Sequence, residues 1–406
     1  STQGVSSAAS DVYKRQFATS LLNWVALRMP SPYKISCTSL KKSTLMRMSS
    51  KVCLCVAAFL VTVCAAGAET VASNSEAERY AAIGVAAATD FPGLAGLCDL
   101  DMRFRDVNTR LPASGDITRS SEQRTTTMDR PSGNESSDRR QRSRGGLSDP
   151  GSERLIATVV FDNLYYLGTG QVSAWLIGTD EGYILIDALN DENDAQKRVI
   201  DGMHALGLDP SAIRYILITH AHGDHFGGAR YLTSELGITV AMSDADWQLA
   251  AMLPPHPRFG LPPDRDTTVR EGDHLTVGQT SVTIRITPGH TAGTVSPIFT
   301  VYDNGIPHTV ALWGGTGFNF GSNPEAFDVY ARSAVSFRKL AEASGVDVFL
   351  SNHPARDGTA QKIEKLAARG PGEPHPFVLG PRALEAFTVL ENCAAAQSAR
   401  LSVIVD

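Results

Sequence analysis

The sequence predicts an α/β fold that gathers polar side chains at one edge of its sheets. Three short apolar runs are each followed by a turn and then by a histidine: His220, His290 or His353. The runs are residues 215–219, 281–286 and 346–350. Short apolar runs bounded by turn residues are typical of buried strands. Because α/β scaffolds carry functional residues on loops where strands end, we expect the three histidines to lie close together.

The first part of the chain does not have the pattern of a folded domain. We interpret residues 1–45 as a non-native leader, because residues 11–16 resemble a translated sequencing adaptor, and we expect the native start at Met46 or Met48. Residues 46–68 have the basic start, apolar middle and small-residue cleavage site of a signal peptide. The apolar stretch is too short to span a membrane, so we expect a periplasmic or secreted protein.

Two further segments precede the main domain, which we place at residues 154–406. Residues 69–100 form an N-terminal extension, and residues 101–153 a disordered linker rich in Ser, Thr, Arg, Gly and Pro. The arginines of this linker fit a solvated segment better than a contact with an anionic surface. Asn134 begins a glycosylation sequon, which has meaning only in a eukaryotic secretory pathway.

Cysteine usage agrees with export. Four of the six cysteines lie in segments that we expect to be absent from the mature protein. The remaining pair, Cys98 and Cys393, is expected to form a disulfide in an oxidising compartment. It would tie the N-terminal extension to a helix predicted at residues 381–400. Two free buried thiols are the alternative.

The segment His220-Ala-His222-Gly-Asp224-His225 offers four side chains that bind zinc within six positions. If the segment is extended, alternation places His220, His222 and Asp224 on one side and His225 on the other. Two diverging sets of ligands favour two adjacent metal ions over one. A polar loop without a metal is the less favoured alternative.

The other histidines lack this context and are expected to be surface or locally hydrogen-bonded residues. They are His204, His256, His274, His308 and His375.

These motifs resemble those of a known family. The H-x-H-x-D-H signature, the Thr-Pro-Gly-His-Thr turn at 287–291 and the Ser-Asn-His-Pro segment at 351–354 resemble the metallo-β-lactamase superfamily, above all the third subclass of its class B enzymes. Residues 160–168, 172–177 and 183–187 resemble the opening strands of that family. The resemblance covers about residues 154–400 and implies a four-layer αβ/βα sandwich with metals between the edges of two sheets.

The resemblance also implies a ligand set and a cofactor, two Zn²⁺ ions. It assigns His220, His222 and His290 to one zinc, and Asp224, His225 and His353 to the other, with a hydroxide between them. A zinc-bound water has a pKa of about 7 and is therefore a nucleophile at neutral pH. Asp224 is expected to be catalytic as well, by orienting the hydroxide and relaying a proton. Asp187, at a strand end, is either a partner that fixes a ligand histidine or an exposed turn residue.

Residues that other branches of the superfamily carry near the metals are missing from this sequence, and their absence limits the choice of substrate. Residues 310–320 contain neither the bridging Asp of glyoxalase II-like thioesterases and lactonases nor the Cys of the first two class B subclasses. Asp303 and Glu325 flank this stretch and are expected to lie too far away. The serines that bind the substrate carboxylate in the third subclass are also absent, and Thr316 or Asn319 could replace them.

The sequence therefore favours a zinc-dependent hydrolase that opens β-lactam rings. The alternatives are a lactonase, esterase or thioesterase on the same metal core, and a zinc-binding scaffold without turnover. Residues 241–247 and 252–260 are expected to form a helix and a loop beside the groove, where they could shape the substrate pocket, although packing explains these residues about as well.

Charge limits the partners. Residues 151–406 carry 18 basic and 29 acidic side chains, a formal net charge of −11. Nucleic-acid-processing members of the superfamily need a basic surface, so nucleic acid is a poor substrate. We expect a monomer that acts on a small-molecule substrate and, once the signal peptide is cleaved, does not bind a membrane.

Overall fold

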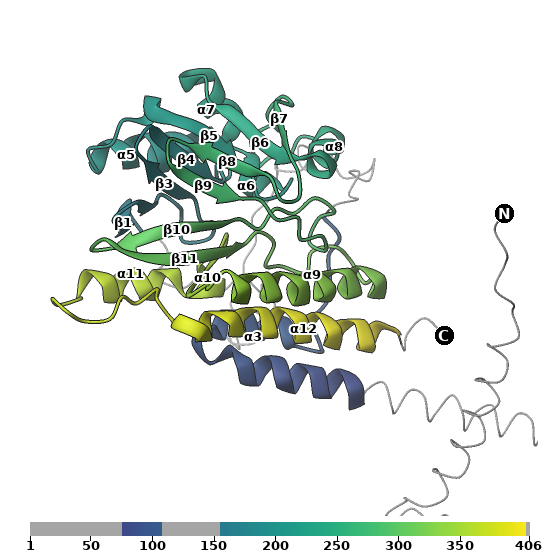
Figure 1. Ribbon diagram of the computed structural model, residues 1–406. Helices are drawn as coiled ribbons and strands as arrows, with labels where there is room; N and C mark the ends of the chain where they lie inside the picture. Colours follow the sequence, from purple (N-terminus) through teal and green to yellow (C-terminus); the bar gives the residue numbers. More distant parts are fainter. Residues whose placement is uncertain (1–74, 108–154, 403–406) are drawn as a thin grey trace, which may run out of the picture. The chain divides into compact units, whose positions relative to one another are not determined.

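Residues 75–107 and 155–402 are described by the computed structural model (Figure 1). The predictions for residues 1–45 and 46–68, for Asn134 and for residues 108–153 of the linker fall outside the described residues. Among those described, no helix combines the length and apolar character that a membrane span requires.

Two β-sheets form the centre of the domain. In spatial order, the first sheet contains β1 (Thr158–Phe161), β2 (Leu164–Tyr166), β3 (Trp175–Thr179), β4 (Gly182–Ile186), β5 (Ile213–Leu217), β6 (Thr239–Ser243) and β7 (Thr267–Val269). The second contains β12 (Val348–Ser351), β11 (Ile306–Trp313), β10 (Ile298–Asp303), β9 (Thr280–Thr283) and β8 (His274–Val277). Strands β4 to β7 pair in parallel, as do β11 and β12, whereas the other pairs are antiparallel.

Helices cover the outer face of each sheet. Those over the first sheet are α4 (Glu192–Asp194), which continues into a π-helical turn (Ala195–Ile200) and α5 (Asp201–Ala205), then α6 (Gly223–Phe226), α7 (Ala229–Leu236) and α8 (Asp244–Met252). Those associated with the second sheet are α9 (Pro324–Ala343), α10 (Pro354–Asp357), α11 (Thr359–Ala367) and α12 (Glu385–Ser402). Short 3-10 turns lie at Pro210–Ala212 and Gly380–Leu384.

Three apolar clusters define the layers. One lies between the sheets and contains residues of both, for example Trp175 of β3 and Leu312 of β11. The other two lie between each sheet and its own helices. The predicted four-layer αβ/βα sandwich is therefore confirmed. The central strands are apolar on both faces because each face is covered.

Helix α9 shows how the sequence determines one of these layers. Asn323 caps its first turn by accepting a hydrogen bond from the Glu325 amide, and Pro324 occupies the first helical position. Its buried side chains, including Phe327, Tyr330 and Phe337, recur every three or four residues and face the sheet and α12.

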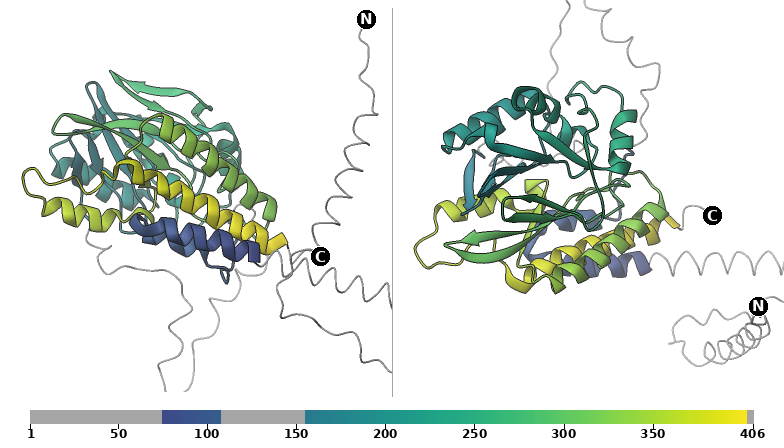
Figure 2. Two further views of the ribbon diagram at one scale, coloured as in Figure 1. Left: turned by 60° about the horizontal axis from the view of Figure 1, so that its bottom comes forward. Right: turned by 45° about the horizontal axis from the view of Figure 1, so that its top comes forward.

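The N-terminal segment is part of this second helical layer. Residues 75–87 are helical and are followed by 3-10 turns (Ala88–Asp90 and Gly96–Cys98) on either side of α3 (Pro92–Ala95). The segment runs along α12, which lies beside α9 (Figures 1 and 2). The predicted disulfide between Cys98 and Cys393 is present. Gly84 leaves room for it, since a Cβ there would lie 2.4 Å from the Cys98 sulfur.

The packed N-terminal segment extends further than we predicted. Residues 101–107, which we assigned to the linker, lie against the domain. Phe104 packs on Phe318 and Phe327, and the Val107 amide donates to the carbonyl oxygen of Asn319 at 2.9 Å. The apolar side chains of this stretch, Met102 and Phe104, pack against the apolar cluster of the second helical layer.

Candidate metal centre

The six predicted ligands converge in two groups. His220, His222 and His290 form the first, and Asp224, His225 and His353 the second. Within each group the candidate ligand atoms lie within 4.8 Å of one another. In the first group, His290 Nε2 is 3.1 Å from His220 Nε2 and 3.0 Å from His222 Nδ1.

Local structure explains why the ligands divide in this way. Strand β5 ends at Leu217. The chain then turns, and His222 occupies the N-cap position of α6. Asp224 and His225 are on α6, so they are not in an extended segment. Our alternation argument, which placed Asp224 with His220 and His222, was therefore wrong. The helical turn is too short to be visible as a periodic pattern, and it moves Asp224 to the second group.

Asp187 fixes a ligand of each group. Its carboxylate accepts hydrogen bonds from His225 Nδ1 at 2.8 Å, from the Thr219 amide at 2.8 Å and from Thr219 Oγ1 at 2.9 Å. Thr219 Oγ1 lies 3.1 Å from His220 Nδ1 and can accept its proton, since its own proton goes to Asp187. Asp187 is buried and has a φ of 62°, so a left-handed turn aims its carboxylate at these partners. The predicted contact between Asp187 and a candidate ligand histidine is present, and Asp187 is not an exposed turn residue.

Backbone carbonyls orient two more ligands. His290 Nδ1 donates to the Gly317 carbonyl oxygen at 2.7 Å, and His353 Nδ1 donates to that of Gln171 at 2.9 Å. In both rings the proton is therefore on Nδ1 and the lone pair is on Nε2, as metal ligation requires.

The residues fit a pair of metal ions. His225 Nε2 is buried and has no hydrogen-bond partner among the described residues, which is costly unless a cation binds it. In the first group, His290 Nε2 lies at hydrogen-bond distance from a ring nitrogen of both His220 and His222, so a single cation could contact all three rings. All-imidazole and imidazole–carboxylate sets both suit zinc.

Electrostatics agree with ligands that are ready to bind a cation. Burial lowers the pKa of His222 to about 4, and burial together with neighbouring imidazoles holds the pKa of His220 and His290 well below the usual range. Burial opposes ionisation of Asp224, yet nearby imidazoles hold the pKa of its carboxyl below the usual range. His225 differs, because the carboxylates of Asp224 and Asp187 outweigh burial and raise its pKa.

A groove of about 320 Å³ opens beside both groups and is large enough for a small organic ligand. Its apolar lining consists of Val107, Phe226, Leu253, Pro254, Pro255, Phe259 and Pro262. The loop after α8 supplies most of these residues, so the prediction for 252–260 is confirmed, whereas residues 241–247 do not line the groove. A Cβ at Gly223 would lie 2.4 Å from the Phe259 ring, so a glycine between the ligands lets this loop lie close to α6.

Of three polar residues in or near the groove, two line it and one does not. Asn319 lines the groove, as a group that binds a substrate carboxylate would. Thr316 does not, because it is fully buried and hydrogen-bonded to Ser351 and Asn352. His256 lines the groove too. Its expected local hydrogen bond is present, from the Arg258 amide to Nδ1 at 3.2 Å. The sequence placed its loop beside the groove but did not single out the imidazole itself as a lining group.

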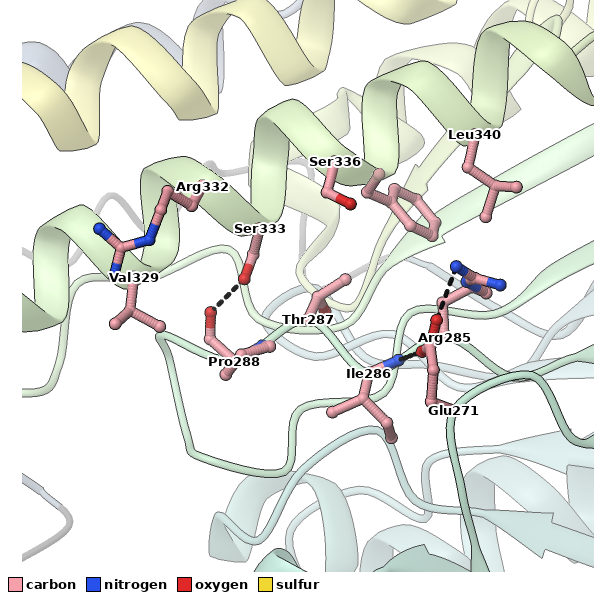
Figure 3. A pocket seen from close by; sticks show the side chains of 11 residues that line it. Glu271, Arg285, Ile286, Thr287, Pro288, Val329, Arg332, Ser333, Ser336 and Leu340 are labelled. Atoms are coloured by element: carbon pink, nitrogen blue, oxygen red, sulfur yellow. Dashed lines mark hydrogen bonds and ion pairs between the residues drawn. The ribbon is translucent and has the colours of Figure 1, made fainter. Parts of the chain in front are cut away.

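Figure 3 shows a separate cleft, between α9 and the strand that leads to His290. Ser333 Oγ donates to the Pro288 carbonyl oxygen at 2.7 Å across this cleft. Arg285 is paired with Glu271 at 2.6 Å, so its charge is already compensated. The cleft therefore shows how α9 holds the turn that carries His290.

Comparison with known proteins agrees with this geometry. Residues 167–301, which include five of the six candidate ligands, match the family described as the metallo-beta-lactamase superfamily. Over these residues the chain is similar to that superfamily. A subclass B3 metallo-β-lactamase of Bradyrhizobium japonicum has a similar structure, with a TM-score of 0.54 and 26% identity over 63% of this chain and 98% of that one. The FEZ-1 metallo-β-lactamase of Legionella gormanii shares the fold, with a TM-score of 0.51 and 23% identity over 59% of this chain and 93% of that one. The predicted resemblance to the third subclass of class B metallo-β-lactamases is thus confirmed.

The curated relatives that the chain matches are hydroxyacylglutathione hydrolases, not β-lactamases. A hydroxyacylglutathione hydrolase of Acidiphilium cryptum is 26% identical over 44% of this chain and 63% of its own length. One of Cereibacter sphaeroides is 36% identical over 23% of this chain and 31% of its own length. The chain thus spans less than two thirds of either curated relative.

Proposed function

We propose that this protein is a zinc-dependent hydrolase that opens β-lactam rings. His220, His222 and His290 would hold one zinc ion, and Asp224, His225 and His353 the other. When bound, two zinc ions supply Lewis acidity toward the carbonyl oxygen and lower the pKa of water to about 7.

Asp224 is the residue that can move a proton. Its side chain is 27% exposed, whereas that of its neighbour His225 is fully buried. Nearby imidazoles lower its pKa and keep the carboxylate ionised. An ionised carboxylate with an exposed oxygen can accept a proton from the attacking water. The water oxygen then bonds to the carbonyl carbon, the C–N bond breaks, and Asp224 returns the proton to the ring nitrogen.

The choice of β-lactam rests on one observation: Asp224 is the only carboxylate in the two candidate groups of the described residues. The stretch where thioesterases and lactonases carry a bridging acid contributes glycines that lie against His290. A Cβ at Gly315 would lie 2.5 Å from the His290 Cβ. Asp303 pairs with Arg369 instead and belongs to neither group.

A second candidate function is hydrolysis of a lactone, ester or thioester. The curated relatives named hydroxyacylglutathione hydrolase favour this reading. A glutathione moiety carries two carboxylates, and no Lys or Arg is present among the described residues that line the groove. Asn319 is the one amide side chain among the described lining residues, so a substrate with at most one carboxylate fits the groove better than a glutathione thioester.

We also propose that the enzyme acts outside the cytoplasm on small molecules. The disulfide between Cys98 and Cys393 supports this, because such bonds persist in oxidising compartments.

A chromogenic β-lactam assay tests the proposed function. The zinc-loaded protein should hydrolyse nitrocefin, a chelator should abolish turnover, and added zinc should restore it. His222→Ala should also lose activity. Chelator-sensitive turnover of a lactone or thioester without nitrocefin turnover would move the second candidate to first place. Zinc binding without any turnover would indicate a non-catalytic scaffold.

A further inference from the structure

Asp246, a residue with no role in the sequence prediction, connects the two segments that carry the first ligand group. It lies on α8 and is fully buried. Its Oδ2 accepts hydrogen bonds from the Ala221 amide at 2.9 Å and from Thr291 Oγ1 at 2.7 Å, and its Oδ1 accepts one from the Gly293 amide at 3.0 Å. Ala221 lies between His220 and His222, and Thr291 follows His290. One carboxylate therefore links the segment that carries His220 and His222 to the turn that carries His290.

The surroundings of Asp246 leave little freedom for this link. A Cβ at Gly293 would lie 2.0 Å from Ser243 Oγ and 2.7 Å from Asp246 Oδ1, so the turn after His290 approaches as closely as a glycine allows. On its other side the same turn is held by α9 through Ser333 and Pro288 (Figure 3). The His290 turn is thus fixed between two helices.

Asp357 has a matching arrangement beside the second group. It lies on α10 and is fully buried. Its Oδ2 accepts from the Ser351 amide at 2.7 Å, and its Oδ1 accepts from the Thr359 amide at 3.0 Å and from Thr359 Oγ1 at 2.6 Å. Ser351 Oγ in turn accepts from the His353 amide at 3.0 Å. This carboxylate therefore fixes the turn that presents His353.

We propose that Asp246 and Asp357 are positioning residues, each for one metal site: Asp246 for the His220, His222 and His290 group, and Asp357 for the group that contains His353. This inference rests on the proposed function only in that both groups bind zinc. Each carboxylate receives three hydrogen bonds over two oxygens, so replacement by asparagine sets an NH₂ group against at least one backbone donor. The two substitutions are therefore matched in volume and in the number of hydrogen bonds that they disturb, although Asp357 also compensates the buried charge of Lys362.

The test isolates each site with a ligand variant. His353→Ala weakens the second group, and His290→Ala the first. In each background, Asp246→Asn and Asp357→Asn are introduced separately, and the zinc Kd of the metal-free protein is measured by competition with a chromophoric chelator. Asp303→Asn, which disturbs a hydrogen-bonded carboxylate outside both groups, is the control.

In the His353→Ala background we expect Asp246→Asn to raise the zinc Kd about 10- to 100-fold and Asp357→Asn to leave it within about threefold, with the reverse in the His290→Ala background. Equal weakening of both sites by either variant, or no weakening, would overturn the proposal. If the unsubstituted protein binds no zinc, the proposed function itself fails, which is a distinct result.

A milder substitution covers the case in which Asp246→Asn does not fold. Thr291→Val keeps the side-chain volume and removes the Oγ1 donor to Asp246. It should raise the Kd of the first site several-fold and leave that of the second unchanged. Unchanged affinity at the first site would contradict the role assigned to Asp246.

Discussion

Replacing Asp187 by asparagine should weaken both metal sites at once. Its carboxylate receives three hydrogen bonds, from His225 Nδ1 and from the amide and hydroxyl of Thr219. Asparagine has one acceptor oxygen and an NH₂ group, so His225 Nδ1 or Thr219 loses its acceptor. Because Thr219 also orients His220, the disturbance reaches a ligand of each group.

The size of the effect follows from the burial of these groups. Asp187 and His225 are almost completely inaccessible to water, so solvent cannot replace a lost hydrogen bond. Loss of such a partner of a ligand histidine typically lowers metal affinity about 10- to 100-fold, or about 1.4 to 2.8 kcal/mol per site. We expect Asp187→Asn to lie in this range at both sites.

The assay is chelator competition on metal-free protein, with circular dichroism to verify folding. Asp347→Asn is the matched control, because Asp347 forms a similar contact of 2.6 Å with His308, which is not a candidate ligand. Asp347→Asn should leave the zinc Kd unchanged. A folded Asp187→Asn protein with unaltered zinc affinity would refute the reasoning.

Three further predictions concern acidity, the disulfide and the groove. As the pH falls, the second group should lose metal before the first, because the raised pKa of His225 lets protons compete earlier; metal content measured across a pH series checks this order. Reduction of the Cys98–Cys393 disulfide, which spans 295 positions, should lower the free energy of unfolding by about 6 kcal/mol on a chain-entropy basis, measured by denaturant titration. Gly223→Ala should displace Phe259 and change the KM for substrate, and Phe259→Ala should restore it; an unchanged KM in Gly223→Ala would contradict this packing.

The convergence of the candidate ligands could be predicted from the sequence because it depends on local patterns, whereas the four layers were implied by the resemblance to the metallo-β-lactamase superfamily. The apolar runs at 215–219, 281–286 and 346–350 contribute to β5, β9 and β12, and each ligand follows its strand within a few residues. The disulfide was predictable by elimination, since only two cysteines lie in the expected mature protein.

What sequence reasoning missed depends on long-range contacts or very short elements. Asp246 contacts residues 25 to 47 positions away, so no local pattern relates it to the ligands. His256 lies in the groove only because its loop folds over Gly223. The helical turn of Asp224 and His225 has four residues, too few for a periodic signal. Residues 101–107 were missed because composition was averaged over a much longer segment.

The most direct test of the two-metal centre is anomalous diffraction at the zinc edge from crystals of the zinc-loaded protein. Two peaks are predicted, one bounded by His220, His222 and His290 and the other by Asp224, His225 and His353. No peak at these positions, or zinc bound only elsewhere, would contradict the assignment of these six residues as metal ligands.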